Sequence, residues 1–302
     1  MGRVLAAVDI GSNTAHILVA DTAKGTLRKI ADENVWLNLG EIVARKGEIP
    51  LGVQDSLIGA LLEFKTLAKS SRAKGIYIFA TEAIRSASNR EAVLKRVHAE
   101  VGVTVDLVAA DQEALYGIKG AMLDTGELAE MIFVEVGGGS VQVAQALNGV
   151  MVKDVSLRLG SGTLRASHLT NYPPAEKEVV KLERYIRHQL EENVEKSDTK
   201  NIVSCGGIAR GLWRCVHPDG DREIYREELE YLIWATSRLD LDTLVARFGV
   251  KPRRAATILP GALVFRELLN FFNRPSMVVS RFGVREGAIL EMAEERIKPC
   301  PI

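Results

Sequence analysis

Residues 8–14 read Val-Asp-Ile-Gly-Ser-Asn-Thr, and residues 134–140 read Val-Glu-Val-Gly-Gly-Gly-Ser. Apolar residues flank both stretches, so each predicts a strand, a tight glycine turn and a second strand. Glycine allows backbone N–H groups to approach a ligand closely, and successive N–H groups that point into one concavity bind anions such as phosphate. Two such hairpins indicate two homologous domains that face each other across a phosphate-binding cleft.

The order of predicted elements supports this duplication. Three strands are expected at 4–9, 14–20 and 26–33, followed by a helix at 55–72, a strand at 76–79 and a helix from Asp111 to about 123. Three strands are expected again at 131–136, 140–147 and 150–157, followed by a helix after Ser161 and a strand at 202–205 that ends in Gly206-Gly207. An internally duplicated α/β chain explains this order better than one large sheet does.

The composition narrows the class of protein. The chain has 302 residues, and Lys plus Arg equals Asp plus Glu at 39 each, which argues against a general nucleic-acid binder. We expect no membrane span, because no apolar run approaches about 18 residues, and no leader peptide, because the first residues lack the charged, apolar and cleavage-site segments of that pattern. The three cysteines show no CxxC spacing, which favours a cytoplasmic protein without disulfides or a zinc site.

Acidic residues accompany the predicted phosphate turns. Asp9 and Glu135 each lie two residues before the first glycine of a turn, and Glu113 falls in the first turn of a helix. From spacing alone, Glu113 is better explained as an acid at a helix start. A carboxylate about 4 Å from a phosphate costs about 4 kcal/mol at an effective dielectric constant of about 20. A cleft that holds both groups therefore implies a bridging divalent cation, for which Mg²⁺ is suited.

Several residues are candidates for binding phosphate. The turns contribute backbone amides and hydroxyl or amide side chains, and arginine binds phosphate oxygens with two parallel donors. The candidates are Gly11, Ser12, Asn13, Thr14, Arg85, Gly137, Gly138, Gly139, Ser140, Gly206, Gly207 and Arg285. Arg281 is a weaker candidate, since an isolated arginine is often part of a surface salt bridge. Lys251, Arg253 and Arg254 form a basic cluster at a helix start, which we interpret as solvated.

The ordered set of motifs resembles the exopolyphosphatase/guanosine pentaphosphate phosphatase (Ppx/GppA) family. The resemblance runs through almost the whole chain in its short, two-domain form. The motifs are DIGSNT at 9–14, ATEAIR at 80–85, QEA at 112–114, GGGS at 137–140, LPGAL at 259–263 and GVREG at 283–287.

This resemblance implies two ribonuclease-H-like domains of the actin/sugar kinase/Hsp70 superfamily, with a phosphate-binding cleft between them. The implied domains are residues 1–125, joined by a C-terminal helix at 285–302, and residues 126–284. The implied activity is release of terminal phosphate from inorganic polyphosphate, or conversion of guanosine pentaphosphate to tetraphosphate in the stringent response.

The resemblance also implies roles for individual residues. Magnesium would be held by Asp9, Glu135 and Gln142. Glu113 matches the catalytic glutamate and would act as the base, with Glu135 also placed in the catalytic set. Arg85 matches an arginine that contacts the phosphate chain, and the resemblance further implies a homodimer.

The chain departs from the family pattern at three acidic positions. Glu135 stands where the family usually has Asp, Gln142 where it has Glu, and Gln112 where it has the first acid of a Glu-Glu pair. Gln142 keeps a carbonyl oxygen for coordination but loses its charge. These changes support an alternative, a polyphosphate or guanosine tetraphosphate/pentaphosphate binding protein with weak or lost hydrolase activity. A small-molecule kinase of the same superfamily is a third interpretation, although the chain shows no clear adenosine-binding element.

Overall fold

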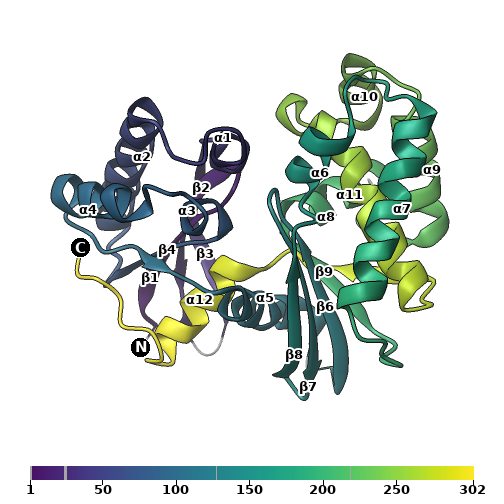
Figure 1. Cartoon of the computed structure of the whole chain (residues 1–302). Coiled ribbons are helices and arrows are strands. Elements are labelled where there is room, and N and C mark those ends of the chain that lie inside the picture. Colours follow the sequence, from purple (N-terminus) through teal and green to yellow (C-terminus); the bar gives the residue numbers. More distant parts are fainter. Residues whose placement is uncertain (1, 24–25, 127, 218) are drawn as a thin grey trace. The chain divides into compact units, whose positions relative to one another are not determined.

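The computed structural model describes residues 2–23, 26–126, 128–217 and 219–302. The chain divides into two compact units. Unit 1 comprises the residues up to Leu123 together with Phe282–Ile302, and unit 2 comprises Asp124–Arg281 (Figure 1). Among the described residues, none of the helices combines the length and apolarity that a membrane crossing requires.

Unit 1 contains a five-stranded mixed sheet in the order β3-β2-β1-β4-β5. Its strands are β1 (Val4–Ile10), β2 (Thr14–Asp21), β3 (Arg28–Trp36), β4 (Ile76–Ala80) and β5 (Asp106–Leu107). The first three strands are antiparallel neighbours, whereas β4 runs parallel to β1. Successive residues of β1 are buried on both faces, which requires helices on both sides of the sheet.

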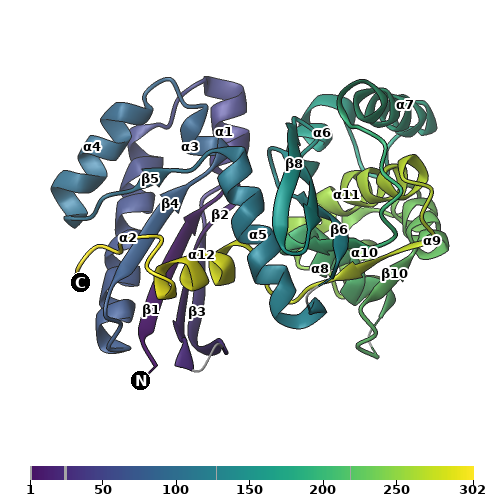
Figure 2. The same ribbon diagram turned by 90° about the horizontal axis from the view of Figure 1, so that it is seen from below.

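The helices of unit 1 cover the two faces of its sheet (Figure 2). Those on one side are α1 (Leu39–Lys46), α2 (Leu51–Ser70), α3 (Glu82–Arg85) and α4 (Arg90–Val101). On the other side are α5 (Ala110–Thr125) and α12 (Val284–Ala293), whose Tyr116 and Ile289 pack with Leu5 and Phe79 of the sheet. The last helix of the chain therefore completes the core of the first unit.

Unit 2 repeats this plan around a six-stranded sheet in the order β10-β11-β9-β6-β7-β8. Its strands are β6 (Glu130–Val136), β7 (Val141–Leu147), β8 (Val150–Leu157), β9 (Ile202–Cys205), β10 (Glu223–Tyr225) and β11 (Ser276–Val279). Its helices are α6 (Ser161–His168), α7 (Glu176–Asn193), α8 (Gly206–Val216), α9 (Arg226–Thr236), α10 (Leu241–Phe248) and α11 (Pro252–Phe271). As in unit 1, the first three strands are antiparallel neighbours, and a later strand, β9, pairs in parallel with the first of them, β6. The predicted α/β fold with a duplicated order is confirmed.

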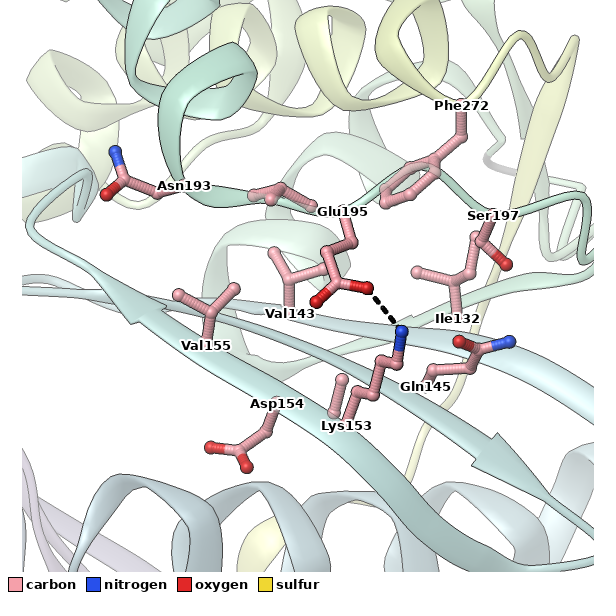
Figure 3. Close-up of a pocket in the computed structure, with 12 residues that line it drawn as sticks. Ile132, Val143, Gln145, Lys153, Asp154, Val155, Asn193, Glu195, Ser197 and Phe272 are labelled. Carbon is pink, nitrogen blue, oxygen red and sulfur yellow. Dashed lines mark hydrogen bonds and ion pairs between the residues drawn. The ribbon is translucent and has the colours of Figure 1, made fainter.

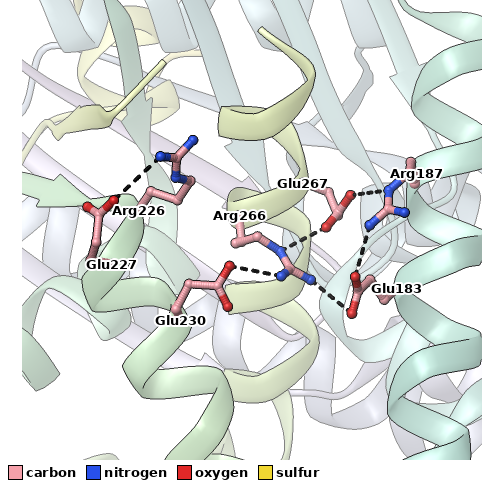
Figure 4. A network of polar contacts seen from close by, with 7 residues as sticks. All are labelled: Glu183, Arg187, Arg226, Glu227, Glu230, Arg266 and Glu267. Carbon is pink, nitrogen blue, oxygen red and sulfur yellow. Dashed lines mark hydrogen bonds and ion pairs between the residues drawn. The ribbon is translucent and has the colours of Figure 1, made fainter. Parts of the chain in front are cut away.

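An ionic network centred on the buried residues Arg266 and Glu267 holds three helices of unit 2 together (Figure 4). Arg266 of α11 contacts Glu183 of α7 at 3.1 Å, Glu230 of α9 at 2.9 Å and its neighbour Glu267 at 2.8 Å. Glu267 is 1% exposed and also pairs with Arg187 at 3.0 Å. Because an unpaired charge at such a position is strongly unfavourable, the network fixes the position of α11 against α7 and α9.

The helices α5 and α12 touch backbone to backbone. A Cβ atom built on Gly287 would lie 1.9 Å from the carbonyl oxygen of Tyr116. We therefore expect Gly287→Ala to lower the free energy of unfolding by about 3 kcal/mol, because the two helices must separate. Gly59 of α2 has no atom within 4 Å of the equivalent position, so Gly59→Ala is the matched control and should be neutral or slightly stabilising. Urea unfolding of both variants checks this, and equal midpoints would contradict it.

Candidate functional site

The first glycine turn connects β1 to β2 in unit 1. The N–H of Gly11 donates to the carbonyl of Thr14 at 3.0 Å and closes the turn. The carbonyls of Ser12 and Asn13 point away from the turn, because they accept the N–H groups that lead into α1: Gly40 donates to Ser12 at 2.7 Å, and Leu37 donates to Asn13 at 2.9 Å. With its carbonyls engaged on one side, the turn is arranged as an anion cradle on the other.

The second glycine turn, between β6 and β7 in unit 2, is built in the same way. Its carbonyls accept N–H groups from the start of α6: Ser161 donates to Gly137 at 3.0 Å, Gly162 to Gly138 at 3.0 Å and Gly160 to Gly139 at 3.2 Å. The Thr163 hydroxyl adds a contact to the carbonyl of Gly139 at 3.3 Å. In both units, therefore, the start of the next helix holds the turn by its carbonyl oxygens.

The helix starts that hold the turns were not predicted to be part of the site. A Cβ atom on Gly40 would lie 2.8 Å from the Cβ of Ser12, and one on Gly160 would lie 2.2 Å from the carbonyl carbon of Gly139. Only glycine permits these approaches without a shift. The sequence does carry a signal, since residues 37–40 read Leu-Asn-Leu-Gly and residues 157–160 read Leu-Arg-Leu-Gly.

Asp9 lies at the end of β1, directly before the first turn. Its Oδ1 atom is buried and has no hydrogen-bond partner in the described part of the chain. Burial raises the pKa of Asp9 from 3.8 to about 6, while the positive charge of Arg285 acts in the opposite direction. A buried carboxylate oxygen without a donor suits a cation, which makes Asp9 a fitting metal ligand.

Arg285 is held close to Asp9 by a second acid. It is the second residue of α12, is 8% exposed, and its Nη1 lies 3.5 Å from Oδ1 of Asp32 on β3. Asp32 is also hydrogen-bonded to His16, and this bond is the main reason why the pKa of Asp32 lies well below its usual range. Asp9 and His16 are cross-strand partners on one face of the sheet. The structure thus brings Asp9, Arg285 and the first turn together within unit 1.

Arg85 contacts the segment that leads into α5, the helix that carries Glu113. Arg85 donates to the carbonyl of Val108 at 2.5 Å and to Glu82 at 2.6 Å. The bond to Val108 ties Arg85 to the segment before the helix that carries Glu113, and the bond to Glu82 lies within α3 itself. The neighbouring Gln112 donates to the hydroxyl of Tyr116 at 2.8 Å, so its side chain forms a hydrogen bond within α5.

Glu135 and Gln142 are cross-strand partners at the ends of β6 and β7. Gln142 is 2% exposed and donates to the hydroxyl oxygen of Ser140 at 3.0 Å, which orients that hydroxyl within the second turn. Glu135 approaches the third glycine turn, because a Cβ atom on Gly206 would lie 2.9 Å from its Oε1. Gly206 has a φ of +86°, which favours glycine.

The interpretation of Arg254 as solvated is wrong. Its guanidinium packs against Gly207 in the first turn of α8, where a Cβ atom would lie 2.2 Å from Nη1. Burial lowers the pKa of Arg254, and the charges of Arg210 and Arg214 lower it further. A half-buried cation beside two other cations and a helix N-terminus forms a strongly electropositive site. No sequence pattern indicated which of the basic residues at 251–254 faces this turn.

The predicted site residues thus form one group in each unit. Unit 1 groups the first turn with Asp9 and Arg285 and holds Arg85 beside the start of α5. Unit 2 groups the second turn with Glu135, Gln142 and the Gly206-Gly207 turn. Within the described ranges, no three His, Cys, Asp or Glu side chains converge closely enough to form a metal site by themselves. Arg281 is exposed and contacts Asp124 at 3.4 Å, so it serves unit 2 as a surface contact.

Comparison with known proteins places this geometry in context. A family model described as the Ppx/GppA phosphatase family matches residues 18–296. Exopolyphosphatase 1 of Mycobacterium tuberculosis is 28% identical over 299 residues, which cover 95% of this chain and 87% of that protein. The crystal structure of the Aquifex aeolicus Ppx/GppA family member has a TM-score of 0.87 and 26% identity, with 99% of this chain and 100% of that chain covered. An exopolyphosphatase structure from Cytophaga hutchinsonii has the same TM-score at 19% identity, over 97% and 98% of the two chains, and supports the fold.

Proposed function

Because the chain belongs to the Ppx/GppA phosphatase family, we propose that it releases terminal phosphate from inorganic polyphosphate or from the 5′ end of guanosine pentaphosphate. The observation that carries this proposal is the pair of equivalent glycine turns, each fastened by its carbonyls to the start of a helix. Such turns present amides to successive phosphates without reorganisation. Arg254 and Arg285 add positive charge to one turn in each unit.

In the proposed reaction Glu113 orients the attacking water and accepts its proton. The bound cation, Mg²⁺, would neutralise charge on the transferred phosphoryl group. Asp9 and Glu135 would hold it, directly or through water, with Gln142 as a weak outer ligand. The buried Asp9 oxygen without a donor fits this role. Phosphates would lie on Gly11, Ser12, Asn13 and Thr14 in unit 1, and on Gly137, Gly138, Gly139, Ser140, Gly206 and Gly207 in unit 2.

The second candidate, a binding protein without efficient hydrolysis, is favoured by one specific observation. Gln142 and Gln112 stand at positions where the family carries acids, and the structure engages both in hydrogen bonds within the fold. The deciding experiment measures phosphate release from short and long polyphosphate and from guanosine pentaphosphate, with Mg²⁺ and with EDTA. Mg²⁺-dependent release supports the hydrolase. Tight binding without release supports the binding protein, and neither binding nor release would contradict both.

Arg254 gives a prediction about substrate affinity. We expect Arg254→Met to raise KM for polyphosphate about 30-fold, because a buried charge partner of a phosphate is lost, with a smaller effect on kcat. The same variant should be at least as stable as the native protein without ligand, since burial and Arg210 disfavour the charge of Arg254. Lys251→Met, an exposed residue of the same cluster, is the control. A KM unchanged in Arg254→Met would exclude contact with substrate.

A further inference from the structure

Unit 2 contains a cavity of about 350 Å³ away from its glycine turns (Figure 3). It lies over β7 and β8, where α7 ends at Asn193 and the chain continues without a helix to cover the sheet. Two cross-strand pairs line it, Val143 with Val155 and Gln145 with Lys153. Gln145 is five residues beyond Ser140, which places this end of the cavity roughly 15 Å along the strand from the second turn.

The floor of the cavity is formed by apolar side chains of the unit 2 core. Ile132 is 1% exposed, Val143 is 5% exposed and Phe272 is 4% exposed, and all three side chains line it. A cavity of this volume with an apolar floor is typical of sites that bind small ring molecules. The ring of Phe272 adds a face or edge against which a planar ligand can pack.

The polar groups lie at the rim of the cavity and include both hydrogen-bond donors and hydrogen-bond acceptors. Lys153 forms an ion pair with Glu195 across the opening, and their side chains are 58% and 75% exposed. Such an exposed pair contributes little to stability, so a ligand can replace it with little loss. Beside Lys153, its cross-strand partner Gln145 donates through its amide to the Thr199 hydroxyl at 3.2 Å, and the carbonyl oxygen of Gln145 is a hydrogen-bond acceptor.

We propose that this cavity binds an uncharged planar heterocycle that carries a lactam, that is, adjacent N–H and C=O groups. The ring would rest on Val143, Val155 and Phe272, its N–H would donate to the Glu195 carboxylate, and its C=O would accept from the Lys153 ammonium. Lys153 and Glu195 neutralise each other and Asp154 adds one negative charge to the lining, so the cavity disfavours an anionic ligand. Oxopurines and pyrimidinones belong to this chemical class. The proposal does not depend on phosphate hydrolysis or on the glycine turns.

The test uses the full chain and a matched pair of probes, 2-quinolone and N-methyl-2-quinolone. The second probe keeps the ring and the carbonyl but lacks the N–H donor. Saturation-transfer NMR and calorimetry should show binding of 2-quinolone, with about tenfold weaker binding of the methylated probe. Absence of binding by 2-quinolone at millimolar concentration, or equal binding of both probes, would overturn the proposal.

Variants then locate the binding. Glu195→Gln should weaken 2-quinolone binding about tenfold, because a charged acceptor is replaced by a neutral amide. Glu192→Gln is the control, since Glu192 lies in the last turn of α7, three residues before Glu195, but pairs with His188 and does not line the cavity. Val155→Phe, on the edge strand β8, should fill the cavity and abolish binding. Unchanged binding in both Glu195→Gln and Val155→Phe, with native melting curves, would place the probe elsewhere and overturn the assignment.

Discussion

Glu113→Gln is expected to lower kcat for phosphate release by about 10²–10⁴-fold, with KM for polyphosphate nearly unchanged. The amide keeps the shape of the side chain but cannot accept a proton from water. Glu113 lies in the first turn of α5, after a segment that is fixed by the bond from Arg85 to Val108. The loss should therefore concern the chemical step rather than the folding of the helix or the binding of phosphates.

Asp111→Asn provides the control for this experiment. Asp111 is an exposed acid in the same helical turn and is expected to leave kcat within about twofold. Release is measured by phosphate detection with saturating polyphosphate and Mg²⁺, and binding is measured separately by calorimetry. A Glu113→Gln variant that binds polyphosphate normally and still releases phosphate at the native rate would show that another group activates the water.

The main strands and the duplicated order could be predicted because they depend on local apolar patterns and on glycine turns. The helix α1 could not be predicted in the same way. It follows Asn38, which has a left-handed φ of 54°, and it is only eight residues long. Its start is stabilised by bonds from Leu37 and Gly40 to the turn carbonyls. A helix whose first turn depends on a hairpin some 25 residues earlier carries little signal in its own composition.

The site shows the same division between local and tertiary information. Asp9 and the glycine turns could be found from the sequence, because acid and glycines are neighbours in the chain. Arg254 could not, because its contact with Gly207 depends on how α11 packs beside α8. The engagement of Arg85 with Val108 is likewise a tertiary contact, and it assigns to this arginine a supporting role that the motif alone did not indicate.

Asp9→Asn is expected to lower phosphate release by at least about 10²-fold while making the metal-free protein more stable at pH 7. Activity falls because the carboxylate proposed to hold Mg²⁺ is replaced by a weaker neutral ligand. Stability rises because burial moves the pKa of Asp9 from 3.8 to about 6, so the folded state disfavours its charge. At about 1.4 kcal/mol for each pKa unit, the native protein loses about 3 kcal/mol relative to the variant as the pH rises from about 4 to about 6.

Urea unfolding of both proteins in EDTA at pH 4 and pH 7 checks the sign of this effect. The variant should gain about 2–3 kcal/mol over the native protein at pH 7 and little at pH 4, where Asp9 is mostly protonated in the folded state. Added Mg²⁺ should then stabilise the native protein more than Asp9→Asn, because the variant lacks one of the two carboxylates proposed to hold the cation in the folded state. Equal stability at pH 7, or equal stabilisation of both proteins by Mg²⁺, would contradict this role for Asp9. If stability rises while activity is lost, the buried charge of Asp9 destabilises the metal-free fold and its role is to bind the cation.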